Sequence, residues 1–301
     1  MSALENEGRS AASQCRLCGN SGELCESHVI PAFVARWIKE TSATGFLRGY
    51  RAPNRRRQDL PTVRLLCSDC EQRLSSAERE FAQKIFLPFL NDNRSRFDYE
   101  VWLLYFAVSL SWRCLATSNG EGLRDHPHHA EAVDRAFYTW KEYLLGRAAA
   151  AGPYRFNLFF TPLGGHSDSR VPEGLSWYFM RGADMTTVYD NVRAATYTKI
   201  PGMLLWTSIV PPDPGRWRGT RIAKRGTLRQ RNQRLAETAA GAFLMDRAKL
   251  IYQRIDSLSP GQRERIAVAV SRDPERAAGS QSFVTWLDDE RLRHENMLKP
   301  R

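Results

Sequence analysis

The first half of the chain carries apolar residues at helical spacing. Segments 31–40 and 70–91 show this period, which predicts an amphipathic helix in each. Segment 99–117 is apolar nearly all round and predicts a central, buried helix, and segment 130–149 is amphipathic again. We therefore expect a helical core, preceded at 41–65 by an irregular, arginine-rich insertion.

The pattern changes after Gly152 and Pro153, where β-branched and aromatic residues stand between turn residues. This composition predicts an antiparallel sheet. Its predicted strands are 154–161, 175–181, 186–189, 193–199, 203–210 and 217–222. Helical spacing then returns. The predicted helices are 235–257, 261–271 and 283–297.

Two C-x-x-C pairs, Cys15 with Cys18 and Cys67 with Cys70, are the strongest chemical signal in the chain. The two-residue spacer lets both thiolates of a pair face one ion, and two pairs complete a tetrahedral zinc site. The alternative is two thioredoxin-like redox motifs, but neither pair lies in a βαβ pattern. The sequence therefore predicts a structural four-thiolate zinc site, with Cys25 outside it as a small core residue.

A histidine-rich segment, His126-Pro-His128-His129, is a second candidate for metal binding. It lies in a polar stretch with no cysteine or other obvious ligand set nearby. We interpret it as a surface loop.

The chain is basic, with 44 Lys plus Arg against 33 Asp plus Glu and a formal net charge of +11. Arginine greatly outnumbers lysine, and a guanidinium binds phosphate bidentately, so DNA is the expected partner. The alternative is a solvated basic surface. The candidate nucleic-acid-binding residues are Arg55, Arg56 and Arg57 in the insertion and Arg218, Arg221, Lys224 and Arg225 near the predicted sheet. Trp217 would stack on a base, unless this segment is a strand edge whose charges oppose aggregation.

The chain shows no sign of export or membrane insertion. Residues 1–14 are polar and carry no secretory signal, and the most apolar run, 101–110, is too short to cross a bilayer. Cysteines assigned to zinc rather than to disulfides fit a reducing compartment. We expect a cytoplasmic protein with no membrane partner.

Residues 15–85 resemble the zinc-bearing, four-cysteine branch of the HNH endonucleases, which have the ββα-metal fold. The resemblance rests on the first C-x-x-C pair, the segment His28-Val29-Ile30-Pro31, and a Leu-Cys-x-x-Cys pair that opens a helix. It implies that His28 is the general base that takes a proton from water. It also implies a catalytic divalent ion, Mg²⁺ or Mn²⁺, with Glu71 at the position of an ion ligand. The remainder resembles a bacterial family with no established activity.

The chain departs from the HNH pattern at its ion ligands. Ser27 stands where the family often has Asp or His before the base, and Glu71 replaces a His or Asn. The middle asparagine of the motif has no clear match, since Asn54 is far from the second pair and Asp59 is nearer. Carboxylates that would supply the missing ligand are Glu26, Glu78 and Glu80. The alternatives are a buried, structural His28 and a Glu71 that only favours the helix dipole.

The predicted fold class is α+β, with an N-terminal zinc-stabilised ββα-metal unit, a helical core, an antiparallel β-rich region and C-terminal helices. The chain is long enough for a real core. Its predicted parts are residues 1–14 (disordered tail), 15–95 (zinc-bound HNH-like unit), 96–151 (helical core), 152–232 (β-rich basic region) and 233–301 (C-terminal helices).

Three functional hypotheses follow from the sequence. The first is a hydrolase: a metal-dependent endonuclease that cuts DNA, serving by fold-level analogy as a bacterial anti-phage defence effector under a regulatory protein or small-molecule trigger. The second is a non-catalytic, zinc-stabilised module with a degenerate HNH site that binds nucleic acid or protein. The third makes the β-rich region a ligand sensor that gates the nuclease.

Overall fold

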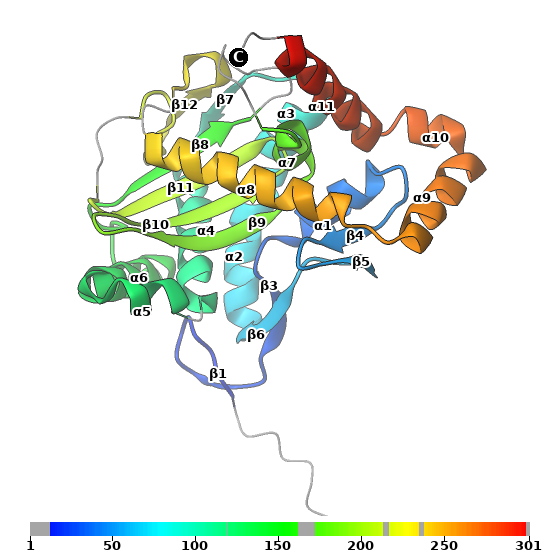
Figure 1. The fold of residues 1–301 in the computed structure, drawn as a ribbon. Coiled ribbons are helices and arrows are strands. Elements are labelled where there is room, and N and C mark those ends of the chain that lie inside the picture. The colour runs from blue at the N-terminus through cyan, green and yellow to red at the C-terminus, as the bar shows by residue number, and fades with distance from the viewer. Residues whose placement is uncertain (1–12, 119, 162–171, 213–216, 235–237, 299–301) are drawn as a thin grey trace, which may run out of the picture.

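The protein is a mixed α+β structure with antiparallel sheets (Figure 1). The computed structural model describes residues 13–118, 120–161, 172–212, 217–234 and 238–298. The predicted disordered tail, residues 1–14, therefore lies almost entirely outside the described residues. Ser13–Gln14 form strand β1, which pairs with β2 (Ser21–Gly22).

The first unit has the predicted strand–strand–helix arrangement. Strand β3 (Cys25–His28) pairs antiparallel with β6 (Thr62–Leu66), and helix α2 (Ser68–Phe81) begins two residues after β6. Helix α1 (Ala32–Glu40) follows β3 and buries Val34, Ala35, Trp37 and Ile38, which lie at helical spacing. Cys70, Leu74, Ala77 and Phe81 form the buried stripe of α2.

The expectation of an irregular insertion at 41–65 is wrong. Strands β4 (Leu47–Gly49) and β5 (Ala52–Arg57) form a hairpin, and β6 also falls in this range. Strand β5 reads Ala-Pro-Asn-Arg-Arg-Arg, and none of its residues is buried. Without a buried face, the sequence has no apolar alternation that would predict a strand.

The helical core is central, as predicted. Helix α4 (Val101–Thr117) is buried from Trp102 to Leu115 apart from Tyr105 and packs against α2, where the rings of Phe81 and Phe106 stack at 4.0 Å. Helix α2 continues through a π-helical turn (Ala82–Phe86) into α3 (Leu87–Asn91). Helices α5 (Glu121–Asp125) and α6 (Ala130–Leu144), with a 3-10 turn (Pro127–His129) between them, complete this layer.

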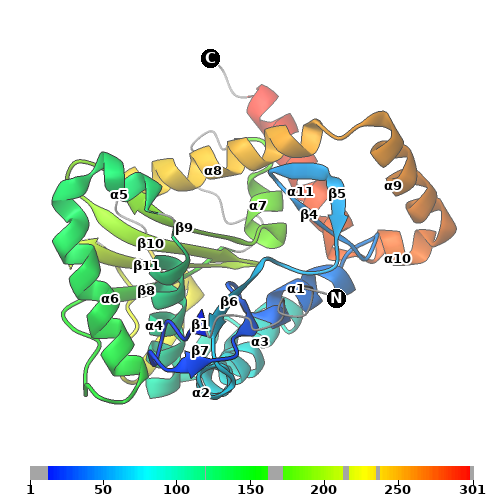
Figure 2. The ribbon, with the colours of Figure 1, turned by 90° about the horizontal axis from the view of Figure 1, so that it is seen from below.

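A four-stranded antiparallel sheet forms the second half, in the order β8 (Arg155–Phe160), β11 (Met203–Val210), β10 (Ala194–Ile200) and β9 (Asp184–Tyr189). Helices α4 and α6 cover one face and α8 (Thr238–Asp256) crosses the other (Figures 1 and 2). Because both faces are covered, every residue of β10 is buried and β11 is buried up to Ile209.

Two predicted strands are absent from this sheet. Segment 175–181 is a helix, α7 (Leu175–Arg181), because a short, wholly buried apolar run fits either structure. Segment 217–222 makes only isolated bridges through Arg218 and Arg221. The strand in this region is instead β12 (Gly226–Arg229), which pairs with β7 (Arg96–Tyr99).

The C-terminal helices form an arch around the β4–β5 hairpin (Figure 2). Helix α8 is followed by α9 (Pro260–Arg272), α10 (Pro274–Ala278) and α11 (Gln281–Leu298), so helices were correctly predicted here, although residues 235–237 lie outside the described part. The Arg48 guanidinium donates to Gln262 at 3.1 Å, and Ser259 N–H donates to Asn54 at 2.8 Å. The C-terminal helices are therefore hydrogen-bonded directly to the hairpin.

One buried apolar cluster extends from Cys15 to Ala248, and the division of the chain into five parts stays a prediction. Within the described residues, no helix is both long and apolar enough to span a membrane.

Candidate metal centre and active site

The four predicted cysteines come together. The sulfur atoms of Cys15, Cys18, Cys67 and Cys70 all lie within 4.8 Å of one another, and Cys18 Sγ is 3.8 Å from Cys67 Sγ. Zinc–sulfur bonds of about 2.3 Å in a tetrahedron separate two sulfurs by about 3.8 Å. Four free thiols at this spacing, two of them on buried residues, fit a structural metal site and zinc in particular.

Local backbone structure creates each half of the cluster. The first pair lies in a tight turn, where Gly19 has a φ of +85° and donates to Cys15 O at 2.8 Å. Backbone N–H groups also donate to sulfur, from Asn20 to Cys18 and from Cys67 to Cys15, both at 3.4 Å. The second pair is supplied by the first residues of α2, whose N-cap is Cys67.

The thiol pKa values show why this cluster favours a cation. Burial raises the pKa of Cys15, but backbone hydrogen bonds from Cys18, Cys67 and Leu17 outweigh it and lower the pKa to about 7. Burial raises the pKa of Cys70, and the nearby Cys15 charge raises it further. Crowding therefore disfavours four thiolates at once unless a bound metal balances their charge.

Among the described residues, no second cluster of three or more His, Cys, Asp or Glu side chains could hold a metal ion. His128 and His129 instead bond the backbone of the β9–β10 turn, at Asn191 O (3.1 Å) and Asp190 O (2.8 Å). The interpretation of this segment as a surface loop is wrong for His129, which is buried.

His28 ends strand β3, opposite Thr62 of β6, and its side chain is 28% exposed. Its Nε2 atom lies 3.0 Å from Asp59 Oδ2. Burial raises the pKa of Asp59, but hydrogen bonds from His28 and from Leu60 N–H outweigh this and hold the pKa below its usual value. An ionised carboxylate therefore faces the imidazole.

Of the two residues considered for the middle position of the motif, Asp59 lies beside His28. The other candidate, Asn54, accepts a hydrogen bond from Ser259 and joins the C-terminal arch instead. The contact between Asp59 and His28 depends on the loop after β5 returning to β3, which local sequence patterns do not reveal.

Glu71 lies in the first turn of α2, at the cysteine end of the strand pair. Its Oε1 atom is buried and has no hydrogen-bond partner among the described residues. Burial raises the pKa of Cys25, and the Glu71 charge is the next cause. His28 is three residues further along β3 than Cys25, roughly 10 Å along a strand. Glu71 therefore lies at the cysteine end of β3, away from His28, and one of its carboxylate oxygens is buried without a hydrogen-bond partner in the described part of the chain.

The other candidate ion ligands are already engaged. Ser27 is buried and its hydroxyl donates to Cys25 O at 3.4 Å. Glu26 accepts from Thr62 at 2.9 Å and from Arg64 at 3.4 Å. Glu78 forms an ion pair with Arg113, with 2.6 Å between Glu78 Oε1 and Arg113 Nη2. Because Glu78 already has a counter-charge, it is not favoured as the missing ion ligand.

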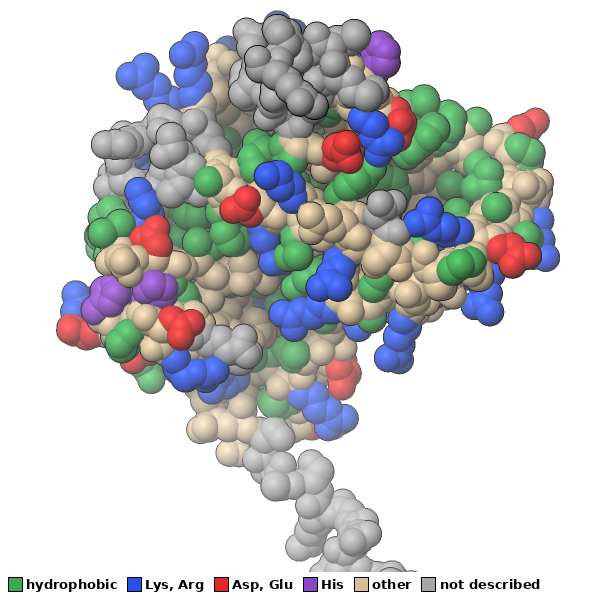
Figure 3. All heavy atoms as spheres, in the orientation of Figure 1, with side chains coloured by type: hydrophobic (Ala, Val, Ile, Leu, Met, Phe, Trp, Pro, Cys, Tyr) green, Lys and Arg blue, Asp and Glu red, His purple; other side chains and the backbone are tan. Residues whose placement is uncertain are grey.

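The two arginine clusters lie in different places. Arg55 and Arg57 are exposed on β5, which leads within two residues to Asp59, whereas Arg56 packs over the Phe46 ring at 4.7 Å. Arg218, Arg221, Lys224 and Arg225 are also exposed, but their segment leads into β12, far from β3 and β6 (Figure 1). Figure 3 shows Lys and Arg side chains at both places. Only the first cluster adjoins His28.

Trp217 does not offer a stacking surface. It is buried and packs against Phe159, with ring centroids 4.7 Å apart, and against Trp206 at 5.6 Å. The expectation that it stacks on a base is wrong, because in this segment the aromatic side chain fills the core while its basic neighbours face solvent.

A buried polar network had no signal in the sequence. Arg247 of α8 donates to both carboxylate oxygens of Asp184, at 2.7 and 2.6 Å, and Tyr178 donates to Asp184 at 3.2 Å. The Arg247 guanidinium also lies over the Tyr50 ring at 5.3 Å. Nearby, Lys199 is fully buried and donates to Phe179 O at 2.6 Å. This network joins α8, the sheet and the hairpin.

The chain matches no protein-family model, no curated protein and no solved structure.

Proposed function

We propose that the protein is a metal-dependent, HNH-like endonuclease that hydrolyses DNA phosphodiester bonds. The observation that carries this proposal is the His28–Asp59 pair at the end of a β3–β6–α2 unit whose helix begins within the four-cysteine cluster. A half-buried imidazole beside an ionised carboxylate is an arrangement suited to general-base catalysis.

In the proposed mechanism, Nε2 of His28 faces the Asp59 carboxylate at 3.0 Å, which leaves Nδ1 to accept a proton. Nδ1 takes that proton from a water molecule, whose oxygen attacks phosphorus as the P–O3′ bond breaks. Asp59 fixes the ring and stabilises the imidazolium that forms. A bound Mg²⁺ or Mn²⁺ would stabilise the charge on phosphate and the leaving oxygen; Glu71, at the other end of β3 from His28, is the ligand that the resemblance proposes for it.

The test is the cleavage of supercoiled plasmid by purified, zinc-loaded protein with Mg²⁺ or Mn²⁺. We expect His28→Ala to lower the rate by at least about 100-fold, because general-base catalysis supplies that much. Asp59→Asn should lower the rate less and shift its pH profile, since the amide leaves the ring oriented but removes the charge. Equal rates for wild type and His28→Ala, with both folded, would refute the assignment.

The basic hairpin is the proposed DNA contact nearest the site. Replacing Arg55 and Arg57 by alanine should weaken binding to a short duplex about tenfold, because two charge-assisted phosphate contacts are lost. Fluorescence anisotropy in EDTA measures this without cleavage. The matched control is the double variant Arg218→Ala and Arg221→Ala, at the distant cluster. If the control loses more affinity than the hairpin variant, DNA binds at β12 and not beside His28.

A non-catalytic nucleic-acid- or protein-binding module is the second candidate. It is favoured by Ser27, which is buried and bonded to its own strand, and by the lack of a second metal-ligand cluster among the described residues. Zinc-loaded protein that shifts DNA on a gel, yet leaves plasmid intact with either metal, would support this function over the first.

A further inference from the structure

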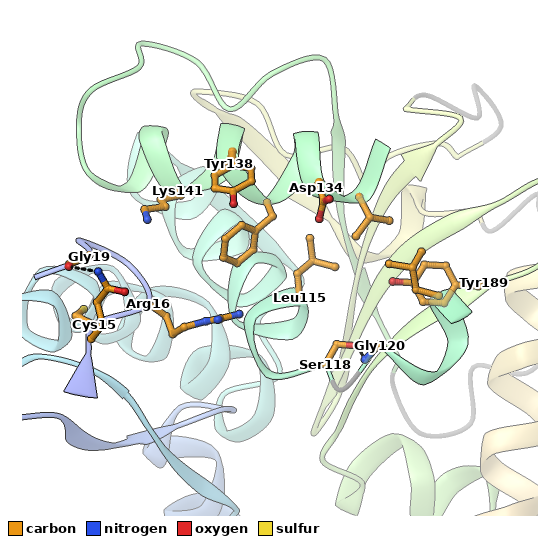
Figure 4. A pocket seen from close by; sticks show the side chains of 14 residues that line it. Cys15, Arg16, Gly19, Leu115, Ser118, Gly120, Asp134, Tyr138, Lys141 and Tyr189 are labelled. Atoms are coloured by element: carbon orange, nitrogen blue, oxygen red, sulfur yellow. Dashed lines mark hydrogen bonds between the residues drawn. The ribbon is translucent and has the colours of Figure 1, made fainter. Parts of the chain in front are cut away.

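A cavity of about 410 Å³ lies between the first C-x-x-C turn and the helical layer (Figure 4). Small-molecule sites commonly have volumes of about 300–1,000 Å³. Its walls combine the turn at Cys15–Gly19, the end of α4, helices α5 and α6, and Tyr189 of β9. His28 does not line it, so this cavity is separate from the proposed active site.

Opposite charges face each other across the cavity. Arg16 extends from the cysteine turn and Lys141 lies on the same side, whereas Asp134 and Tyr189 lie on the other (Figure 4). Within the described part of the chain, none of the side chains of Arg16, Lys141 and Asp134 forms a hydrogen bond or ion pair. The lining therefore presents two cations and one carboxylate that a ligand could satisfy.

Aromatic side chains lie between these charges. Arg16 is stacked over the ring of Phe137, with 5.9 Å between its Cζ atom and the ring centroid. Tyr138 also lines the cavity and is exposed. A ligand that fits both the charges and the rings has an anionic group at one end and a flat ring bearing a hydrogen-bond donor at the other.

We propose that this cavity binds a mononucleotide, with its phosphate between Arg16 and Lys141 and its base beside Phe137, where an amino group reaches Asp134. Phosphate satisfies both cations, and the base supplies the ring and the donor in one molecule of this size. Because Arg16 stands between two zinc-binding cysteines, the bound nucleotide also stabilises the cysteine turn. This site makes no use of His28 and stands whether or not the chain is a nuclease.

Isothermal titration of the zinc-loaded, full-length protein with AMP, GMP and CMP tests the proposal, and UMP, whose base carries no amino group, is the control. At least one should bind saturably at one site per chain, and its nucleoside and inorganic phosphate should bind at least about tenfold more weakly. Slower transfer of zinc to a chelator should accompany binding. The absence of saturable binding by AMP, GMP and CMP, or equal binding by UMP or by phosphate alone, overturns the proposal.

Variants assign the site. Arg16→Ala and Lys141→Ala should each weaken the nucleotide's affinity about tenfold, through the loss of a charge-assisted contact. Arg135→Ala is the matched control, because Arg135 lies on the same helix but pairs with Glu131 and does not line the cavity. If Arg16→Ala loses zinc, its weaker nucleotide binding has a second cause, and the affinity of Lys141→Ala alone then tests the site. Unchanged affinity in Lys141→Ala overturns the proposed pose.

Discussion

Replacing Cys70 by serine is expected to release zinc and to unfold the β3–β6 strand pair with the start of α2. Cys70 is buried within a cluster whose sulfur atoms lie within 4.8 Å of one another. Structural zinc sites contribute on the order of 10 kcal/mol of apparent binding free energy, and three thiolates hold the ion far less well. Zinc content per chain and hydrogen exchange of residues 15–81 measure the loss.

Cys25→Ser is the matched control for this variant. Cys25 lies on β3 close to the cluster but is not part of it, so the control should keep one zinc per chain and normal exchange. The prediction fails if Cys70→Ser also keeps its zinc, or if Cys25→Ser loses it. In the first case three cysteines suffice, and in the second Cys25 is a ligand.

Sequence patterns predicted those parts of the fold that depend on residues close together in the chain. The C-x-x-C spacing alone specifies two turns that each aim two sulfurs at one point, and the structure brings all four together. Helix α4 was predictable because an almost wholly apolar run of 17 residues is too long for a strand. The seven residues of α7 had no such signal, since a short buried run fits a strand equally well.

The hairpin and the candidate site depend on contacts between distant residues. Strand β5 has no buried face, and the partners of the β4–β5 hairpin include Gln262 and Ser259, more than 200 residues away. Asp59 meets His28 only because the chain returns from that hairpin to pair β6 with β3. The resemblance singles out His28 as a candidate, whereas the carboxylate that lies beside it can be assigned only from the fold.

Glu78→Ala is expected to destabilise the whole protein by about 3–5 kcal/mol, because it leaves a buried guanidinium without its counter-charge. The Arg113 side chain is only 2% exposed, and Glu78 Oε1 lies 2.6 Å from its Nη2 atom. The Nε and Nη1 atoms of Arg113 have no hydrogen-bond partner among the described residues. Urea denaturation followed by tryptophan fluorescence measures the change in the free energy of unfolding.

Glu80→Ala is the matched control for Glu78→Ala, since Glu80 lies two residues away on α2 and pairs with the exposed Lys84. Removing the Glu80 side chain should change the free energy of unfolding by about 0.5 kcal/mol or less.

Glu78 lies on α2, the helix that begins at the second cysteine pair, and Arg113 lies on the central helix α4. The pair therefore joins the zinc unit to the core, and Glu78→Ala should loosen both together. If Glu78→Ala is as stable as Glu80→Ala, Arg113 is balanced by other groups. If Glu78→Ala stays stable and only residues 15–81 show faster hydrogen exchange, the two parts fold independently.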